Sequence, residues 1–385
     1  MTSPSMPPRT DPPRSRGLVL GRIADAPVVL TPSWAIAAVV LTIVFAPTVR
    51  FYAPGQTGVI YGVSFAFVVL LFGSVFLHEV SHALVARARG QHVTELAITV
   101  WGGHTAFTGS LRRPRDAFWV AVVGPLTNLV LAGGFWFLFE LRTGTVLVWL
   151  LCYAAAVSNA FVGLFNLIPG LPLDGGQMLA AAVWAATGSQ DRGTVVAGYV
   201  GRVVAVGSVL AVIAVPLAQG GSVEPFLVIW AVFIGMFLWS GASGAIRSGR
   251  ARARLAHLDV STFVHPAATV PADGTVADTA AAGRGAGAWA VVIVDGTGRP
   301  VGVVDPANAA QVPADRLTTT SVWAVAHRLP LEALLRSTSA GPDLVAGVVA
   351  AAPGTSVVPV VDETGTVVGV VLVREVLAAV RGTSA

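Results

Sequence analysis

The chain is apolar almost continuously from residue 31 to residue 245, and this stretch restricts it to folds that sit in a lipid bilayer. Hydrophobic residues make up 54% of the 385 residues and charged residues only 11%, whereas about a quarter of a soluble globular protein is charged. The shortage of charge is confined to residues 31–245, because both ends of the chain are polar. The composition therefore predicts a polytopic α-helical membrane protein with soluble ends.

Six segments are long enough to cross a hydrocarbon core of about 30 Å at a rise of about 1.5 Å per residue. We expect them at residues 32–49, 58–88, 115–140, 144–168, 194–218 and 223–245. Arginines gather before the first segment, between the second and third, and after the sixth, which all fall on one side of the membrane. The positive-inside rule makes that side cytoplasmic. The sequence thus predicts a multi-pass protein of the bacterial plasma membrane with both termini in the cytoplasm.

The polar ends divide into three parts. Residues 1–30 are rich in Pro, Arg and Ser and lack the apolar stretch of a signal peptide, so we expect a disordered tail before a six-helix domain at 31–245. Residues 246–256 are expected to form a basic linker. The chain has 24 basic and 20 acidic residues, but the arginines lie beside hydrophobic segments, which indicates membrane orientation and no nucleic-acid partner.

Residues 257–385 contain an internal repeat. The stretches AVVIVDGTGRPVGVV and VPVVDETGTVVGVV both predict a strand, a turn and a second strand, and Asp362 lies 67 positions after Asp295. Each copy is followed by a stretch typical of a helix. We therefore expect a cytoplasmic domain of two α/β units, at about 257–315 and 318–382.

Residues 92–109, HVTELAITVWGGHTAFTG, lie between the second and third membrane segments. Their alternating pattern and the Gly102-Gly103 pair predict a β-hairpin. Because an exposed hairpin cannot lie in lipid, this one is expected to be screened by protein or to line a cavity.

The motif HEVSH, residues 78–82, follows a long uncharged run. On a helix, His78 and His82 share one face and can bind one Zn²⁺, while Glu79 adjoins the metal as a general base for water. The alternative is a polar patch that joins helices. Ionisable groups at membrane depth cost about 2.5–3.5 kcal/mol each and usually mark function, which favours the metal site.

A catalytic zinc site needs a third protein ligand. Asp174 lies in NLIPGLPLDGGQ, residues 166–177, where prolines and glycines interrupt the helical pattern at the depth of His82. An ordinary loop aspartate or a helix cap is the alternative. The match in depth to the HEVSH motif favours a metal ligand.

Three further residues are candidates for contact with a substrate or an oxyanion: Asn128, Gly102 and Gly103. Asn128 ends the motif GPLTN in the third membrane segment, where its amide could hold a substrate carbonyl. An interhelical hydrogen bond, with Gly124 and Pro125 providing close packing and a kink, is an equal alternative.

These motifs together resemble the site-2 protease family of intramembrane zinc metalloproteases. The resemblance rests on HEVSH in a membrane helix, GPLTN in a later helix, and the N-x-x-P-x-x-P-L-D-G-G run, with a WGG hairpin after the first motif. The paired units at the C-terminus resemble cystathionine-β-synthase (CBS) domains, which one branch of that family carries. The resemblance covers residues 30–385.

The resemblance implies a role for each matching residue. His78, His82 and Asp174 would bind one zinc ion per chain, and Glu79 would be the catalytic base. Asn128 matches the family's membrane asparagine. The substrates implied are single-pass membrane proteins already trimmed by another protease, such as bacterial anti-sigma factors, in regulated intramembrane proteolysis within the lipid bilayer.

The two CBS-like copies differ from the nucleotide-binding signature of CBS domains. The signature G-h-h-[ST]-x-x-D reads GVVDPAN from Gly302 and GVVLVRE from Gly369, so neither copy has the hydroxyl or the aspartate. This disfavours an adenine nucleotide. A scaffold role or a homodimer formed through the CBS domains is the alternative.

Two other classes of function share part of this pattern. A CBS-regulated channel or transporter would also have six membrane helices and a cytoplasmic pair of units, and an inactive membrane scaffold would share the fold. Neither explains the HEVSH motif together with Asp174. The complete set of zinc-binding residue types favours the protease.

Overall fold

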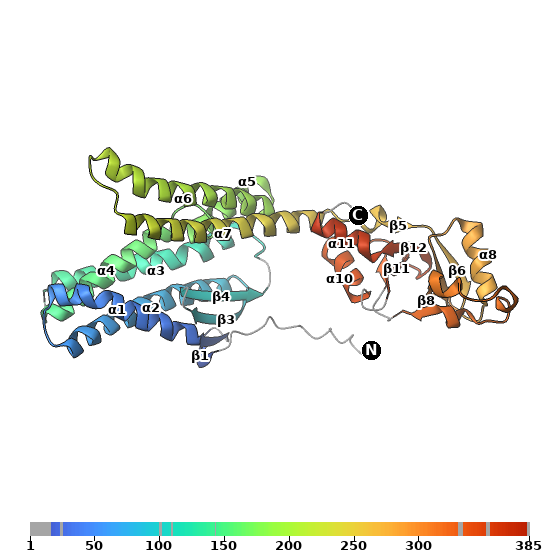
Figure 1. The fold of residues 1–385 in the computed structure, drawn as a ribbon, viewed down its shortest axis with the longest axis horizontal. Coiled ribbons are helices and arrows are strands. Elements are labelled where there is room, and N and C mark those ends of the chain that lie inside the picture. The colour runs from blue at the N-terminus through green and yellow to red at the C-terminus, as the bar shows by residue number, and fades with distance from the viewer. Residues whose placement is uncertain are drawn as a thin grey trace. The chain divides into compact units, whose positions relative to one another are not determined.

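The computed structural model describes residues 17–23, 26–99, 102–108, 111–142, 144–329, 334–351 and 355–382. The chain forms two compact units, Met1–Gly249 and Arg250–Ala385 (Figure 1). The first unit contains long helices and one small sheet, and the second contains short helices and strands.

Among the described residues, six helices are long and apolar enough to cross a membrane. They are α1 (Pro32–Tyr52), α2 (Thr57–Ala88), α3 (Pro114–Glu140), α4 (Val146–Asn166), α6 (Gln190–Ala218) and α7 (Pro225–Ala256). Their outward faces carry large apolar side chains such as Val130, Phe161 and Val203, as lipid contact requires. The expected number of membrane segments is confirmed.

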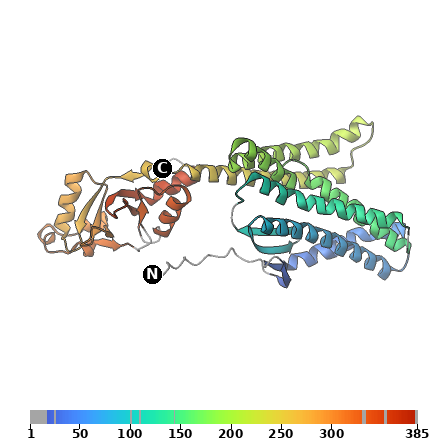
Figure 2. The same cartoon turned by 180° about the vertical axis from the view of Figure 1, so that it is seen from behind.

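Small residues let these helices approach one another closely. Helices α6 and α7 can also be seen from the opposite side in Figure 2. In this pair, Gly198 of α6 lies against Ala242 and Ile246 of α7. Gly235 of α7 lies against Ala205 and Val209 of α6 in the same way. A Cβ atom at either glycine would collide with the facing helix.

The predicted hairpin forms as β3 (His92–Thr99) and β4 (Gly102–Thr108), which pair antiparallel. Positions 100, 101 and 109 of the predicted hairpin lie outside the described residues. The hairpin belongs to a four-stranded sheet of order β1-β2-β3-β4, in which β2 runs parallel to β3.

The prediction of a disordered tail at residues 1–30 is wrong for the second half of this range. Residues Leu18–Ile23 form β1 and residues Ala26–Leu30 form β2. Strand β2 is short, and it is stabilised by a partner far along the chain, because Val28 pairs with Leu96 and both are buried. A strand of five residues whose partner is so distant has no local sequence signal.

The interrupted stretch after α4 leads into a short helix, α5 (Asp174–Thr187), whose first residue is Asp174. Gly175 and Gly176 lie directly against the backbone of residues 167–171, so that a side chain at either position would collide with it. The two glycines therefore let this loop fold back on the start of α5 and fix the position of Asp174.

The second unit contains two four-stranded sheets. The first sheet has the order β6-β7-β8-β9, and its strands are Ala267–Pro271, Ala290–Val294, Pro300–Val304 and Ala326–Arg328. The second has the order β10-β11-β12-β5, and its strands are Leu335–Arg336, Val357–Val361, Val367–Leu372 and Val264–His265. The helices of this unit are α8 (Val276–Ala286), α9 (Pro306–Ala309), α10 (Gly341–Ala351) and α11 (Val373–Arg381).

The repeat is visible in the turns of the two sheets. Asp295 accepts hydrogen bonds from the backbone and hydroxyl of Thr297, and Asp362 accepts the same pair from Thr364. These bonds hold the pKa of both aspartates below the usual value. The two copies thus share one turn structure.

Two predicted boundaries differ from the structure. Strand β5 lies in the predicted first copy but pairs with β12 of the second, while β9 lies in the predicted second copy and pairs with β8 of the first. The copies exchange edge strands, which covers edges that would otherwise be open. Residues 246–256 form no separate linker, because α7 continues to Ala256 through alternating Arg and Ala, which are good helix formers.

The buried strand β2 gives a test of the fold. We expect Val28→Asp to lower the free energy of unfolding by about 2 kcal/mol or more, because it places an unpaired charge where the side chain is 3% exposed. Val19→Asp in β1, where the side chain is 59% exposed, is the matched control. Equal Tm values for the two variants in detergent would contradict the sheet described here.

Candidate active site

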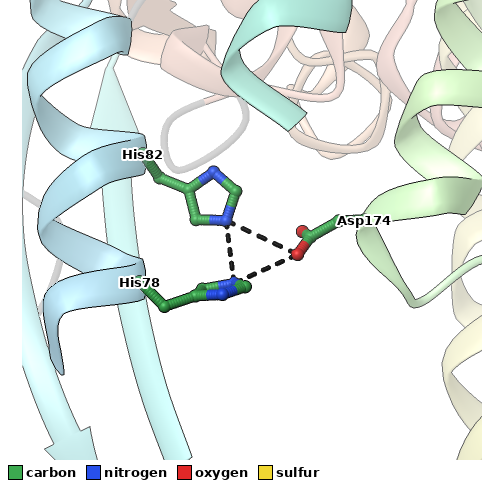
Figure 3. Close-up of side chains that lie close together, drawn as sticks. All are labelled: His78, His82 and Asp174. Carbon is green, nitrogen blue, oxygen red and sulfur yellow. Dashed lines mark hydrogen bonds and ion pairs between the residues drawn. The ribbon is translucent and has the colours of Figure 1, made fainter. Parts of the chain in front are cut away.

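His78, His82 and Asp174 converge on one point in the first unit (Figure 3). The Nε2 atoms of the two histidines, one turn apart on α2, are 3.0 Å from each other. The Oδ2 atom of Asp174 lies 3.1 Å from Nε2 of His78 and 3.5 Å from Nε2 of His82. In the described part of the chain, this is the group of His, Cys, Asp or Glu side chains arranged to hold a metal ion.

The hydrogen bonds behind the two imidazoles fit a metal site. Nδ1 of His78 lies 2.5 Å from Oδ1 of Asn128, and Nδ1 of His82 lies 2.6 Å from the carbonyl oxygen of Val120. Because both partners are oxygens, each Nδ1 carries a proton, and in the neutral form of the two rings each Nε2 directs a lone pair at the other. Two such lone pairs beside a carboxylate repel one another unless a cation lies between them, and they form a donor set that suits zinc.

Gly124 of α3 makes room for this group. A Cβ atom at Gly124 would collide with Nε2 of His82 and would approach Nε2 of His78 to 2.6 Å. The sequence pattern indicates close packing at Gly124 but not this contact with the imidazoles. Its spacing from Asn128, one helical turn away on the same face, was the available signal.

Both polar atoms of the Asn128 side chain are hydrogen-bonded within the protein. Its Oδ1 accepts from His78, and its Nδ2 donates to Oδ1 of Asn159 at 2.9 Å. Asn159 in turn donates to Oγ of Ser74 at 3.0 Å. The interhelical alternative therefore describes Asn128 better than contact with a substrate carbonyl, and its effect is to orient the His78 ring. Asn159 and Ser74 were missed, although polar residues within membrane helices are a general signal.

Glu79 faces the β-sheet. Its Oε2 accepts a hydrogen bond of 2.7 Å from Oγ1 of Thr105 in β4. Gly103, also in β4, lies so close to the Glu79 side chain that a Cβ atom would collide with it. Gly102 begins β4 and pairs with Thr99. Both glycines are candidates for substrate contact from the sequence, whereas no sequence pattern singles out Thr105.

A cavity of about 380 Å³ joins these groups. Glu79, His82 and Asp174 line one part of it. Gly103, Thr105 and Phe107 also line the cavity, and because they alternate along β4 they project from one face of the strand. Since β4 ends the strand order in the described sheet, its outer edge is not hydrogen-bonded to another described strand. A strand edge and the metal-binding group therefore border the same space.

The sequence profile of peptidase family M50 matches residues 66–145 and 142–212. This part of the chain is thus similar to peptidase family M50. The resemblance to the site-2 protease family is thereby confirmed. The matched residues run from α2 to α6 and include the three converging side chains, Glu79 and Asn128.

Rip3 of Mycobacterium tuberculosis strain H37Rv is 36% identical over 235 residues, which cover 58% of this chain and 57% of Rip3. The protein sll0528 of Synechocystis sp. PCC 6803 is 29% identical over 257 residues, which cover 64% of each chain. Both proteins carry the words zinc metalloprotease in their names. This chain thus spans about three fifths of the length of these two relatives.

Two kinds of solved structure are similar to parts of the chain. The site-2 protease from Methanocaldococcus jannaschii matches 60% of this chain and 94% of its own length, at 22% identity and a TM-score of 0.41. The CBS domain of a bacterial CNNM/CorC family Mg²⁺ transporter matches 35% of this chain and 94% of its own length, at 17% identity and a TM-score of 0.28.

The close contact of Gly124 with the imidazoles leads to a prediction. We expect Gly124→Ala to weaken zinc binding about 10- to 100-fold, because the added Cβ displaces the Nε2 atoms. Gly133→Ala in the same helix meets no atom within 4 Å and is the control. Zinc titration of the purified variants measures the difference, and equal affinities would contradict the geometry.

Proposed function

We propose that the chain is an intramembrane zinc endopeptidase that cleaves membrane-spanning segments of single-pass proteins. The observation that supports it most is the convergence of His78, His82 and Asp174 beside Glu79, in a cavity that an edge strand borders. A buried group of this kind within membrane helices has a cost in free energy that a scaffold would have no reason to retain.

The three converging side chains would hold one zinc ion per chain. When bound, zinc supplies a Lewis acid that polarises the peptide carbonyl and brings the pKa of water to about 7. The protein contributes the orientation of its ligands, because Asn128 and the Val120 carbonyl fix the tautomer of both histidines.

Glu79 is the residue we propose as the general base. Thr105 donates to its Oε2, which fixes the carboxylate and leaves Oε1 to accept a proton from water. As water adds to the peptide carbonyl, its proton passes to Glu79. When the C–N bond breaks, Glu79 gives that proton to the leaving amine nitrogen. The base then returns to its starting form.

The strand β4 is the element we propose for substrate binding. A peptide bond inside a helix is shielded, so the substrate must unwind near the site. An extended segment can add to the outer edge of β4, which satisfies backbone groups that lipid would leave unpaired. This supports substrates trimmed beforehand by another protease, as in regulated intramembrane proteolysis of anti-sigma factors, because a cavity of about 380 Å³ excludes a folded domain.

The chain is proposed to lie in a bacterial plasma membrane with both termini in the cytoplasm. Arginines cluster at the end of α2, before α3 and at the end of α7, as the positive-inside rule expects. His82 lies six residues before the end of α2, or about 9 Å along the helix. Water would therefore reach the site from the cytoplasmic side.

The second unit is proposed as a scaffold and a homodimer contact. At the signature positions, Asp305 caps its own helix through Ala307 and contacts His327, while Glu375 pairs with His265 at 2.8 Å. These carboxylates are thus engaged within the protein, which argues against their binding the ribose of an adenine nucleotide.

The role of Glu79 can be tested with a variant in which an amide replaces the carboxylate. We expect Glu79→Gln to retain one zinc per chain but to cleave a single-pass substrate at least about 100-fold more slowly, because Gln cannot take up a proton. Glu140→Gln, at the exposed end of α3, is the control. Zinc analysis and product analysis by mass spectrometry are the measurements. Undiminished cleavage by Glu79→Gln, or wild-type protein without stoichiometric zinc, would contradict the proposal.

A further inference from the structure

Arg202 lies inside a membrane-spanning helix, and the proposed cleavage does not use it. It belongs to α6 and its side chain is half-buried. Its guanidinium stands 4.7 Å from the ring centroid of Trp239 and 5.8 Å from that of Tyr199. Its Nε and Nη2 donate to Oγ of Ser243 at 3.1 and 2.9 Å.

The positive charge of Arg202 has no counter-ion within the described part of the chain. The structure records no carboxylate within ion-pair distance of it among those residues, and both recorded hydrogen bonds end on one neutral hydroxyl. A guanidinium has five N–H donors, so the Nη1 group still requires an acceptor. A charge at membrane depth is retained where an anion or water meets it.

The depth of Arg202 indicates which anion can meet it. Arg202 lies 16 residues before Ala218, or about 24 Å along α6, against a hydrocarbon thickness of about 30 Å. Trp239 lies 14 residues after Pro225, or about 21 Å along α7. Both residues therefore approach the boundary on the arginine-rich side. Tyr199 and Trp239 are the aromatic types that favour this interface, where phospholipid phosphates lie.

An apolar groove of about 500 Å³ begins beside the arginine. Its walls are formed by α6 and α7, and Trp239 both lines the groove and contacts Arg202. The lining residues include Ala205, Val206, Val209 and Leu210 of α6. Those of α6 lie one to two turns beyond Arg202 towards Ala218, so the groove extends from the interface into the hydrocarbon region.

We propose that this site, the α6–α7 groove with Arg202, binds one anionic phospholipid. The phosphate accepts hydrogen bonds from the free N–H groups of Arg202, and one acyl chain lies in the apolar groove. A guanidinium suits a phosphate because it presents paired donors in a plane. A net negative lipid is favoured over a zwitterionic one, because the charge of Arg202 is otherwise uncompensated.

The neighbours of this site hold the loop that leads to Asp174. Gly201 lies against the carbonyl of Leu171. A Cβ atom at Gly241 would come within 2.7 Å of the Pro172 ring. The groove and the metal-binding group are therefore linked through one pair of packed helices. A lipid that stabilises the α6–α7 pair is expected to stabilise the position of this loop.

Native mass spectrometry of the full-length protein tests the proposal. Phosphatidylglycerol and phosphatidylcholine are titrated separately into the detergent-purified wild type and variants. We expect one tightly held phosphatidylglycerol on the wild type, about tenfold weaker binding in Arg202→Gln, and partial retention in Arg202→Lys. Val206→Trp, which fills the groove, should also weaken binding. Arg50→Gln, an exposed arginine of α1, should match the wild type.

Several results would overturn the proposal. Equal phosphatidylglycerol binding by the wild type and Arg202→Gln would remove the arginine from the site. Equal binding of phosphatidylcholine would remove the preference for a net negative lipid. Displacement by millimolar inorganic phosphate would indicate a site for free anions, and displacement by a transmembrane peptide would indicate a substrate groove. A Tm of Arg202→Gln within a few degrees of the wild type would confirm that the variant is folded.

Discussion

The structure of the first unit depends on holding His78, His82 and Asp174 together between long apolar helices. Each of these groups alone would be costly among membrane helices. The two imidazoles need hydrogen-bond acceptors at their Nδ1 atoms, and they need space around their Nε2 atoms. Helix α3 provides both, because it carries the Val120 carbonyl and Asn128 on the face that also presents Gly124. The packing of α2 on α3 thus accommodates both imidazole rings.

The four-stranded sheet of the first unit meets a second requirement, which concerns backbone hydrogen bonds. Strands expose backbone donors and acceptors, which lipid cannot satisfy. Strands β1 and β2 cover one side of the hairpin, while β4 remains at the edge beside the cavity. Thr105 on that edge contacts Glu79. Addition of a substrate strand to β4 would therefore bring its peptide bonds next to the proposed base.

The sequence was informative where the signal was local. Apolar runs predicted the six long helices, alternation predicted the hairpin, and the spacing within HEVSH placed two histidines on one helical face. The interrupted stretch around Asp174 predicted a position near that face, and the structure places it there.

What sequence reasoning missed depends on contacts between distant residues. Strand β2 is stabilised by β3 across more than 60 residues, and the exchange of β5 and β9 joins the two copies of the repeat. The contacts of Gly124 and Thr105 require knowledge of which helix or strand faces α2. No pattern within one segment contains that information.

X-ray absorption at the zinc edge of the purified protein tests the central claim most directly. The account predicts one zinc per chain in a four-coordinate site, with two imidazole nitrogens at about 2.0–2.1 Å and the remaining ligands oxygen at about 2.0–2.2 Å. Replacement of Asp174 by Ala should leave both imidazoles in the spectrum and change the oxygen shell alone. A wild-type spectrum without imidazole scattering, or one that Asp174→Ala leaves unchanged, would contradict the account.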